Sequence, residues 1–272
     1  MAKKINCFIP VQEKNQVIET VNGLKANELV AKIYLLATED FNEAIEGCEV
    51  VKIDSLQSSA TVKKIAELSD APYSLIYTKY TTLELGYFAL ERIVNLAEDS
   101  NASMLYADHY QIIDGVKKAS PVIDYQFGSL RDDFNFGSVL FYNAEALKCG
   151  ASRMKQDYKF AGLYDLRLKV AQKGELCHIN EYLYTEIEND NRKSGAKIFD
   201  YVDPKNRGVQ IEMEQACTEH LKEIGGYLEP KFEHIEFSEN NFEFEASVII
   251  PVFNRVKTVR DAIKSVLAQE TN

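Results

Sequence analysis

The chain has 272 residues, of which 46% are hydrophobic, so it can bury the core of one large α/β domain or of two smaller ones. Its net charge of −11 at pH 7 argues against nucleic acid as a partner, because a phosphate-backbone binder needs a basic face. The five cysteines and four histidines are dispersed and suggest no metal cluster, and no apolar run approaches the ~20 residues that span a bilayer.

The chain opens with a strand, a turn and a helix. Residues 5–11 form an apolar run that contains Pro10, and a polar turn from Gln12 to Asn15 follows it. The apolar face of the helix behind this turn consists of Val17, Ile18, Val21 and Leu24. No apolar signal-peptide region precedes the strand, so we expect a cytoplasmic protein. Peripheral association of a longer parent protein with the inner face of the membrane stays open.

Short apolar runs then alternate with helical patterns. Further strands are expected at residues 32–37, 50–53, 73–77, 103–107, 137–142 and 176–179. Further helices are expected at residues 61–68, over Leu85, Phe88, Ala89 and Leu96, at residues 144–148, over Leu163, Leu166 and Val170, and from Val209 to Ile224. Strands that are separated by helices predict a mostly parallel sheet.

Three segments interrupt this alternation. Residues 111–118 predict an antiparallel hairpin, because Asp114-Gly115 suits a type I′ turn. Residues 122–136 have no clear period, and residues 186–207 are polar and predict a loop.

The end of the chain repeats its beginning. Residues 229–245 alternate acids with aromatics and predict an extended linker between a domain at 1–228 and the opening of a second at 246–272. Ala246 to Val252 predicts a buried strand, and residues 259–267 predict a helix. Superposing Pro10 on Pro251 aligns two similar strand–turn–helix units, which are either a duplicated domain or two unrelated pairs with similar sequences.

The second copy carries the more specific motif. Val248-Ile-Ile-Pro-Val-Phe-Asn254, a basic turn and a helix ending Ser265-Val-Leu-Ala-Gln269 resemble the opening of inverting glycosyltransferases of family two. Residues 4–225 resemble that family more loosely. The resemblance implies a three-layer α/β fold of the GT-A type, a nucleotide-diphospho-sugar transferase fold whose mostly parallel sheet carries an antiparallel hairpin insertion. It also implies a tandem-domain bacterial protein with a divergent first copy.

The resemblance implies transfer of a sugar from a nucleotide-sugar donor to a growing glycan, such as a surface polysaccharide. In the family an Asp-x-Asp turn after the fourth strand holds Mg or Mn, and an acidic pair on a late helix supplies the general base. Here the metal turn is Tyr77-Thr-Lys-Tyr-Thr81, and the acidic pair aligns with Gly162-Leu163. The expected ligand turn is therefore missing, although Lys79 could face a phosphate. Asp165 is the candidate base, or a remnant that orients the helix.

Further residues are assigned to the donor by the same resemblance. Pro10, Gln12 and Glu13 belong to the segment that meets the nucleotide sugar. Glu39 and Asp40 match the family's acidic turn that contacts the nucleoside, with a solvated turn as the alternative.

Two groups of residues are candidates for the acceptor or the sugar. Arg131, Asp132 and Asp133 lie beside aromatics and could hold a sugar, or they could form a salt-bridged loop. Asp108 and His109 end a strand and could face the crevice, or they could stabilise a turn.

Two alternatives to a transferase stay open. The first copy could be a non-catalytic glycan-binding or scaffold module attached to an active glycosyltransferase domain in the same chain. It could also be another nucleotide-sugar enzyme, such as a nucleotidyltransferase, although no Gly-rich phosphate loop follows the first strand.

Overall fold

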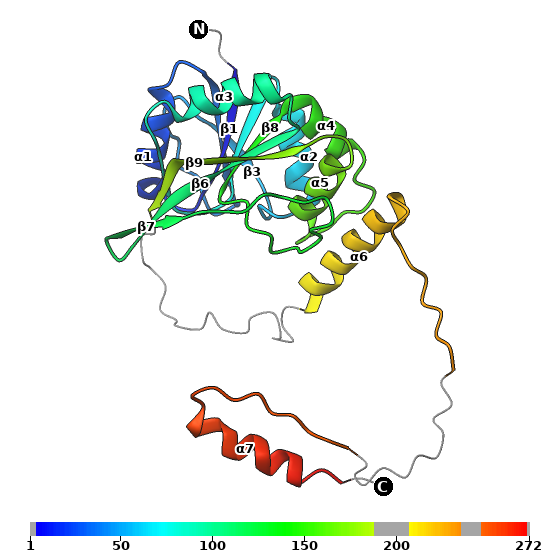
Figure 1. Cartoon of the computed structure of the whole chain (residues 1–272). Coiled ribbons are helices and arrows are strands. Elements are labelled where there is room, and N and C mark those ends of the chain that lie inside the picture. The colour runs from blue at the N-terminus through cyan, green and yellow to red at the C-terminus, as the bar shows by residue number, and fades with distance from the viewer. Residues whose placement is uncertain (1–3, 188–206, 235–245, 271–272) are drawn as a thin grey trace. The chain divides into compact units, whose positions relative to one another are not determined.

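The computed structural model describes residues 4–187, 207–234 and 246–270. The chain divides into two compact units, residues 1–227 and residues 228–272. In the first unit a twisted sheet is covered by helices on both faces (Figure 1).

Nine strands of the described part form one sheet in the order β3-β2-β1-β4-β8-β6-β9-β5, with β7 beside β6. Their bounds are β1 (Ile5–Val11), β2 (Val30–Ala37), β3 (Glu49–Lys52), β4 (Tyr73–Tyr77), β5 (Thr82–Leu85), β6 (Met104–Ile113), β7 (Val116–Ser120), β8 (Val139–Asn143) and β9 (Leu176–Ile187). β1 to β4 pair in parallel, as do β6 and β9. β8 lies antiparallel between β4 and β6.

Two hydrophobic cores lie on opposite faces of the sheet. The helices are α1 (Lys14–Lys25), α2 (Ser59–Leu68), α3 (Ala89–Ser100), α4 (Ala144–Ser152), α5 (Gly162–Ala171), α6 (Arg207–Glu223) and α7 (Val256–Leu267). Because side chains alternate along a strand, Cys7 and Ile9 of β1 join the core under α1 and α3, whereas Phe8 joins the core under α2, α4 and α5. This arrangement confirms the predicted three-layer α/β class.

The predicted hairpin is confirmed. β6 and β7 pair antiparallel, and Asp114 and Gly115 between them have φ values of 53° and 75°, as a type I′ turn requires. β6 and β9 both run several residues beyond the predicted strands. Glu186 therefore lies in β9 and not in the predicted loop, most of which, at 188–206, falls outside the described residues.

The helix predicted over Leu85 and Phe88 begins later, at Ala89. Leu85 ends β5, which pairs with β9, and the chain then turns through Phe88, whose φ is 54°. The prediction was wrong because a period-two strand stands directly before the helical pattern, and its partner strand lies about a hundred residues away in the sequence.

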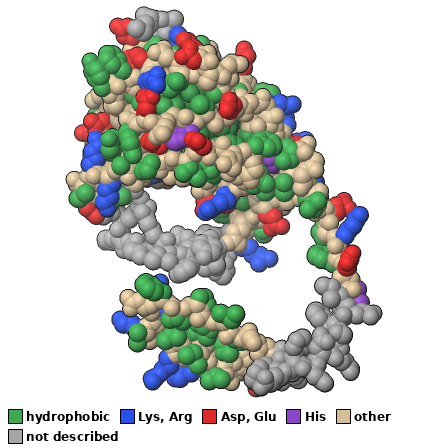
Figure 2. Space-filling view, viewed as in Figure 1, with side chains coloured by type: hydrophobic (Ala, Val, Ile, Leu, Met, Phe, Trp, Pro, Cys, Tyr) green, Lys and Arg blue, Asp and Glu red, His purple; other side chains and the backbone are tan. Residues whose placement is uncertain are grey.

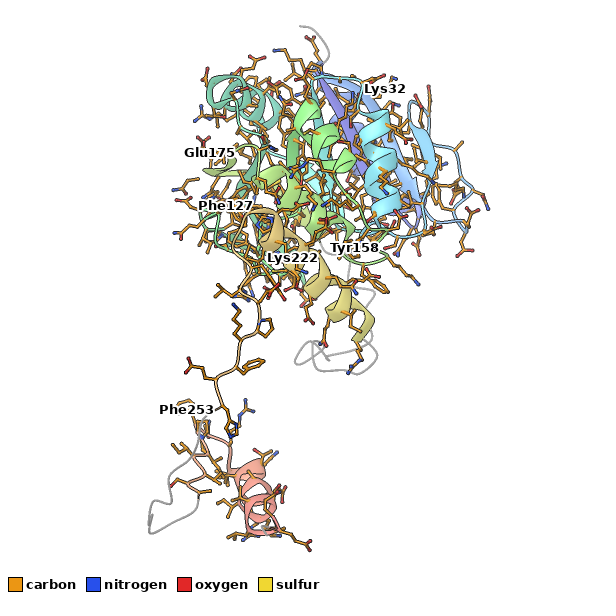
Figure 3. The ribbon with its side chains drawn as sticks, turned by 90° about the vertical axis from the view of Figure 1, so that its right-hand side faces the viewer. Lys32, Phe127, Tyr158, Glu175, Lys222 and Phe253 are labelled. Atoms are coloured by element: carbon orange, nitrogen blue, oxygen red, sulfur yellow. The ribbon has the colours of Figure 1, made fainter. Side chains whose placement is uncertain are left out.

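The strand predicted at Ala246 to Val252 is not formed. The described residues of the second unit contain helix α7 but no strand with which this segment could pair, and Val248 and Ile249 are exposed. An isolated strand leaves its backbone donors and acceptors to water, so apolar sequence alone does not produce one. Phe253, labelled in Figure 3, is also exposed.

Helix α6 packs against α5 through a small apolar cluster. The cluster consists of Tyr158, Ala161, Tyr164, Leu168 and Ala216. Figure 3 views the molecule from the side on which α6 and Tyr158 lie. None of the described helices is long and apolar enough to cross a lipid bilayer. On the first unit, acidic and basic side chains are mixed over the face that Figure 2 shows.

Candidate active site

The turns that follow the parallel strands meet at one edge of the sheet. Val11 pairs with Ala37, and Ala37 pairs with Lys52. On the other side of β1, Phe8 pairs with Ile76. The carboxyl ends of β1 to β4 therefore lie at one level, where open α/β sheets bind their ligands. The residues predicted to contact the nucleotide sugar lie near these strand ends: Pro10 in β1, Gln12 and Glu13 after β1, Glu39 and Asp40 after β2, and Lys79 after β4.

A cavity of about 390 Å³ lies between the end of β4 and α5, and we call it the α5 cavity. Its lining includes Thr78, Asp132, Phe136, Leu163, Arg167 and Met213. Thr78 belongs to the turn that aligns with the family's metal turn, and Leu163 to the position of the acidic pair. The α5 cavity is therefore the candidate active site.

Lys79 in the turn after β4 is paired with a buried carboxylate. Its Nζ lies 2.5 Å from Oε2 of Glu186, whose side chain is fully buried while that of Lys79 is partly exposed. Burial opposes ionisation of Glu186, but its hydrogen bonds and the neighbouring positive charge, above all those of Lys79, together outweigh burial, so the pKa of Glu186 lies below its usual value. Gln111 also donates to Oε2 of Glu186. Lys79 is thus held at the edge of the sheet by a partner in β9.

His109 lies buried on the other side of Glu186. Its Nε2 is 3.4 Å from Oε1 of Glu186, and its ring stacks on that of Tyr184. Burial lowers the pKa of His109, although the charge of Glu186 acts in the opposite direction. His109 is not among the residues that line the α5 cavity.

The acidic turn at Glu39 and Asp40 is exposed and held by a lysine that the sequence analysis did not single out. Lys52, at the end of β3, donates from Nζ to the carbonyl oxygens of Thr38 and Glu39 at 3.2 and 3.1 Å. It also donates to the carbonyl oxygen of Phe41. The two carboxylates therefore stand on an ordered backbone, which suits either contact with a ligand or a solvated turn.

Of the group Arg131, Asp132 and Asp133, two members pair with each other and one does not. Arg131 donates to both carboxylate oxygens of Asp133 at 2.8 Å, and both side chains are mostly exposed. This pairing lowers the pKa of Asp133, chiefly through the hydrogen bond. Asp132 also lines the α5 cavity, and none of the ion pairs among the described residues involves it. Asp132 is therefore the member of the group that is available to a hydroxyl.

Asp108 is buried and anchors the segment that follows β7. Its Oδ1 accepts a hydrogen bond from the backbone N–H of Val122 at 2.8 Å and lies 3.0 Å from Nε2 of His178. His178 Nδ1 in turn lies 2.7 Å from Asp124. Asp108 therefore fastens the segment after β7 to the sheet, and it is not among the residues that line the α5 cavity.

Asp165 lies on the side of α5 that faces α6. Its side chain is fully buried, and its nearest charged partner is Lys169, whose Nζ is 3.8 Å away. Burial raises the pKa of Asp165 to about 6, although Lys169 acts against the rise. Lys169 also binds Glu219 and Glu223 of α6. Asp165 does not line the α5 cavity, and its role as a base stays a prediction.

Gly162, at the first position of the acidic pair, stands where a side chain does not fit. Its N–H donates to the carbonyl oxygen of Gln57 at 2.7 Å, and a Cβ placed on it would lie 2.4 Å from the backbone nitrogen of Ser59. Because those atoms belong to the backbone, they cannot move aside cheaply. The close approach of α5 and α2 therefore requires glycine here.

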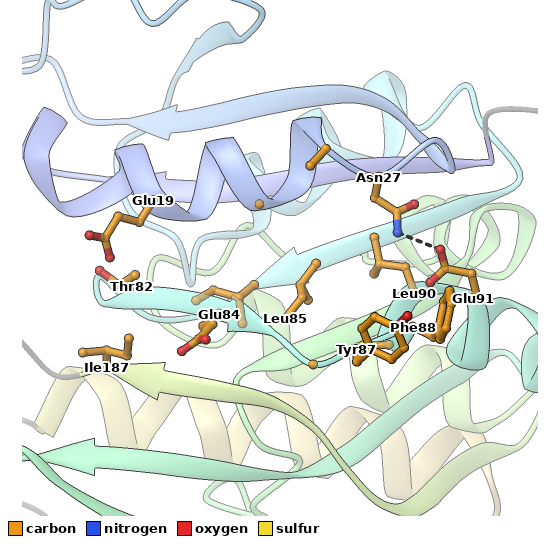
Figure 4. Close-up of a pocket in the computed structure, with 15 residues that line it drawn as sticks. Glu19, Asn27, Thr82, Glu84, Leu85, Tyr87, Phe88, Leu90, Glu91 and Ile187 are labelled. Carbon is orange, nitrogen blue, oxygen red and sulfur yellow. Dashed lines mark hydrogen bonds between the residues drawn. The ribbon is translucent and has the colours of Figure 1, made fainter.

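A second cavity, of about 580 Å³, lies between α1, β5 and the start of α3 (Figure 4). Tyr87 and Phe88 stand exposed at its wall, and Asn27 donates to Glu91 across one end at 3.0 Å. The predicted site residues do not line it. It therefore offers less reason to be the active site than the α5 cavity.

The sheet order, with an antiparallel strand between β4 and β6 and a cavity at the carboxyl end of β4, is that of a GT-A-like glycosyltransferase fold. Two solved structures of S. aureus TarS, a glycosyltransferase, are similar to the chain. The TarS 1-349 complex with UDP-GlcNAc matches with a TM-score of 0.56 and 10% identity, over 80% of this chain and 66% of that one. The complex with UDP matches with a TM-score of 0.50 and 8% identity, over 82% and 72%.

The match spans slightly less than two thirds of the first of these TarS chains. No family model matches the sequence, and no curated protein is significantly similar to it. The similarity therefore establishes the fold.

Proposed function

We propose that the chain contains a divergent nucleotide-sugar-dependent glycosyltransferase domain, residues 1–228, of family two. It would transfer a sugar to a growing glycan, such as a surface polysaccharide, within a tandem protein whose second copy begins at residue 246. The observation that carries the proposal is the α5 cavity, which lies at the carboxyl end of β4 in a GT-A-like fold. The similarity to TarS structures solved with UDP-GlcNAc and UDP supports a uridine nucleotide as the first donor to test.

In this proposal different residues of the sheet edge contact different parts of the donor. Glu39 and Asp40 would accept hydrogen bonds from the nucleoside, and Pro10, Gln12 and Glu13 would contact the nucleotide sugar beside it. Lys79 would face the diphosphate as a point charge. Asp132 would accept a sugar hydroxyl.

The residues at the turn after β4 do not fit a Mg or Mn ion. A divalent cation needs oxygen ligands, and the turn Thr78 to Thr81 offers a lysine in place of carboxylates. The described residues contain no group of three His, Cys, Asp or Glu side chains that could hold a metal. We therefore assign no step to a metal ion in this unit.

The second candidate function is a glycan-binding or scaffold module without turnover. It is favoured by Gly162 and Leu163, since a glycine that cannot carry a side chain and a leucine occupy the positions of the acidic pair. A module of this kind would use Asp132 and the aromatic wall of the α5 cavity to bind a sugar.

Calorimetric titration of the full chain with UDP-GlcNAc, other uridine and guanosine diphosphate sugars, and the free sugars separates the two candidates. The transferase proposal expects saturable binding of at least one nucleotide sugar and release of its nucleoside diphosphate when acceptor is added. Binding of the glycan alone, with no heat from any nucleotide sugar, would favour the module and remove the transferase. The titrations are run with and without manganese.

A further inference from the structure

A buried arginine in the α5 cavity has no carboxylate partner among the residues that the structure describes. Arg167, on α5, is 5% exposed and lines the cavity. Its Nη2 donates to the carbonyl oxygen of Arg131 at 3.0 Å, and its Nη1 lies 3.5 Å from that of Ser129. Its Nε is buried and has no hydrogen-bond partner in the described part of the chain. None of the ion pairs among the described residues involves Arg167.

Aromatic rings surround this guanidinium. Its central carbon lies 4.7 Å from the ring centre of Tyr164, 5.5 Å from that of Phe136 and 5.8 Å from that of Tyr125. Ring faces and carbonyl dipoles attract a cation but do not neutralise it. A buried charge is costly unless it is paired and hydrogen-bonded, so the site favours an anion.

The cavity offers complementary groups to one kind of ligand. Arg167 supplies a fixed positive charge with a free donor, Asp132 supplies a carboxylate that accepts hydroxyl groups, and Phe136 and Tyr164 supply ring faces. A molecule with a phosphate next to a sugar carries all three matching features. The cavity volume of about 390 Å³ suits one sugar and its phosphate.

We propose that Arg167 binds a phosphate oxygen of a sugar phosphate in the α5 cavity and so supplies positive charge that carboxylate-bound metal would otherwise bring. The inference rests on the proposed function, because the phosphate is either that of the donor diphosphate or one carried by the glycan acceptor. Arg167 would be a binding residue of the same site, at a position for which the resemblance implies no role.

The test titrates the full chain with UDP, uridine, pyrophosphate and glucose 1-phosphate. We compare the wild type with Arg167→Met, which keeps an apolar stem, and Arg167→Lys, which keeps the charge. The wild type should bind the phosphate compounds, and Arg167→Met should weaken that binding about 10- to 100-fold without changing binding of uridine, if uridine binds. The phosphate affinity of Arg167→Lys should lie between those of the wild type and Arg167→Met, because an ammonium keeps the charge but loses the paired N–H donors of the guanidinium.

The matched control is Arg153→Met. Arg153 is also partly buried and donates to the carbonyl oxygen of Lys169, but it pairs with Glu223 and does not line the α5 cavity. This variant should lower stability and leave phosphate binding unchanged. Glucose 1-phosphate added to protein saturated with UDP then identifies the source, since displacement indicates the donor phosphate and simultaneous binding an acceptor phosphate.

Two results would overturn the inference. One is a wild type that binds UDP no more tightly than uridine and binds neither pyrophosphate nor glucose 1-phosphate, a result that needs no variant to fold. The other is an unchanged phosphate affinity in Arg167→Met, which would mean that Arg167 only stabilises the loop at 129–131 through its hydrogen bonds. Failure of the proposed function looks different, because the wild type would then bind sugar phosphates through Arg167 but no nucleotide sugar.

Discussion

Replacing Asp165 by Asn should change the pH dependence of stability in a direction opposite to that of most carboxylates. Asp165 is fully buried, and both its carboxylate oxygens have no hydrogen-bond partner among the described residues. Burial raises its pKa to about 6, from roughly 3.9 in an unfolded chain. The folded state therefore binds the Asp165 proton more tightly than the unfolded state does.

The sign and the size of the expected change in stability follow from this difference in pKa between the folded and unfolded states. The stabilising contribution of protonated Asp165 is fully present below about pH 4 and is lost as the pH rises through about 6. A shift of about two pKa units corresponds to roughly 3 kcal/mol. Asp165→Asn removes the titration, so its stability relative to the wild type should rise by up to about 3 kcal/mol between pH 4 and pH 7.

Urea unfolding from pH 4 to pH 8, followed by tyrosine fluorescence because the chain has no tryptophan, measures this difference. Asp157→Asn is the control, since Asp157 is mostly exposed and its pair with Lys63 should contribute little at any pH. A flat difference between variant and wild type, or a variant that loses relative stability as the pH rises, would refute the reasoning. If Asp165→Asn keeps sugar transfer intact, Asp165 is not the base.

Three further changes test the packing beside the site, the charge pair at its edge and the turn between β6 and β7. Gly162→Ala should destabilise the first unit by about 3 kcal/mol in urea unfolding, because its Cβ would lie 2.4 Å from a backbone atom, and a wild-type midpoint would contradict this. Lys79→Met should cost about 2 kcal/mol at pH 7 by leaving Glu186 buried without its cation, and adding Glu186→Gln should restore most of the loss. No restoration would mean that the pair is not the cause. Gly115→Ala should cost about 1 kcal/mol in thermal unfolding through its φ of 75° alone, since the space around it is open.

Local sequence predicted the strands that are buried on both faces. The bounds of β1 and β4 match the predicted residues 5–11 and 73–77, because a continuous apolar run between polar turns has few other folded solutions. β5 was missed because Leu83 and Leu85 alternate over only four residues and its stability comes from pairing with β9. Pairing across that separation is not encoded in any local pattern.

The site was predicted less well than the sheet. The edge position of Glu39, Asp40 and Lys79 followed from strand ends, a local property. The partner of Lys79 is 107 residues away, so the Lys79–Glu186 pair could not be found from spacing. Arg167 left no distinct signal, because Asp165 and Lys169 are charged residues of the same helix and only the structure shows that Arg167 is buried in the α5 cavity.

The two cations of the site are not equally available to a phosphate. Lys79 is already neutralised by Glu186, so a diphosphate must compete with a buried carboxylate that has few other partners. Among the described residues, the Arg167 guanidinium contacts carbonyl oxygens and ring faces and takes part in no ion pair, so a phosphate meets no paired carboxylate there. We therefore expect Arg167→Met to weaken UDP binding more than Lys79→Met does when both are measured at pH 7 and the same ionic strength. The reverse order would place the diphosphate at the turn after β4 and would limit the α5 cavity to the sugar.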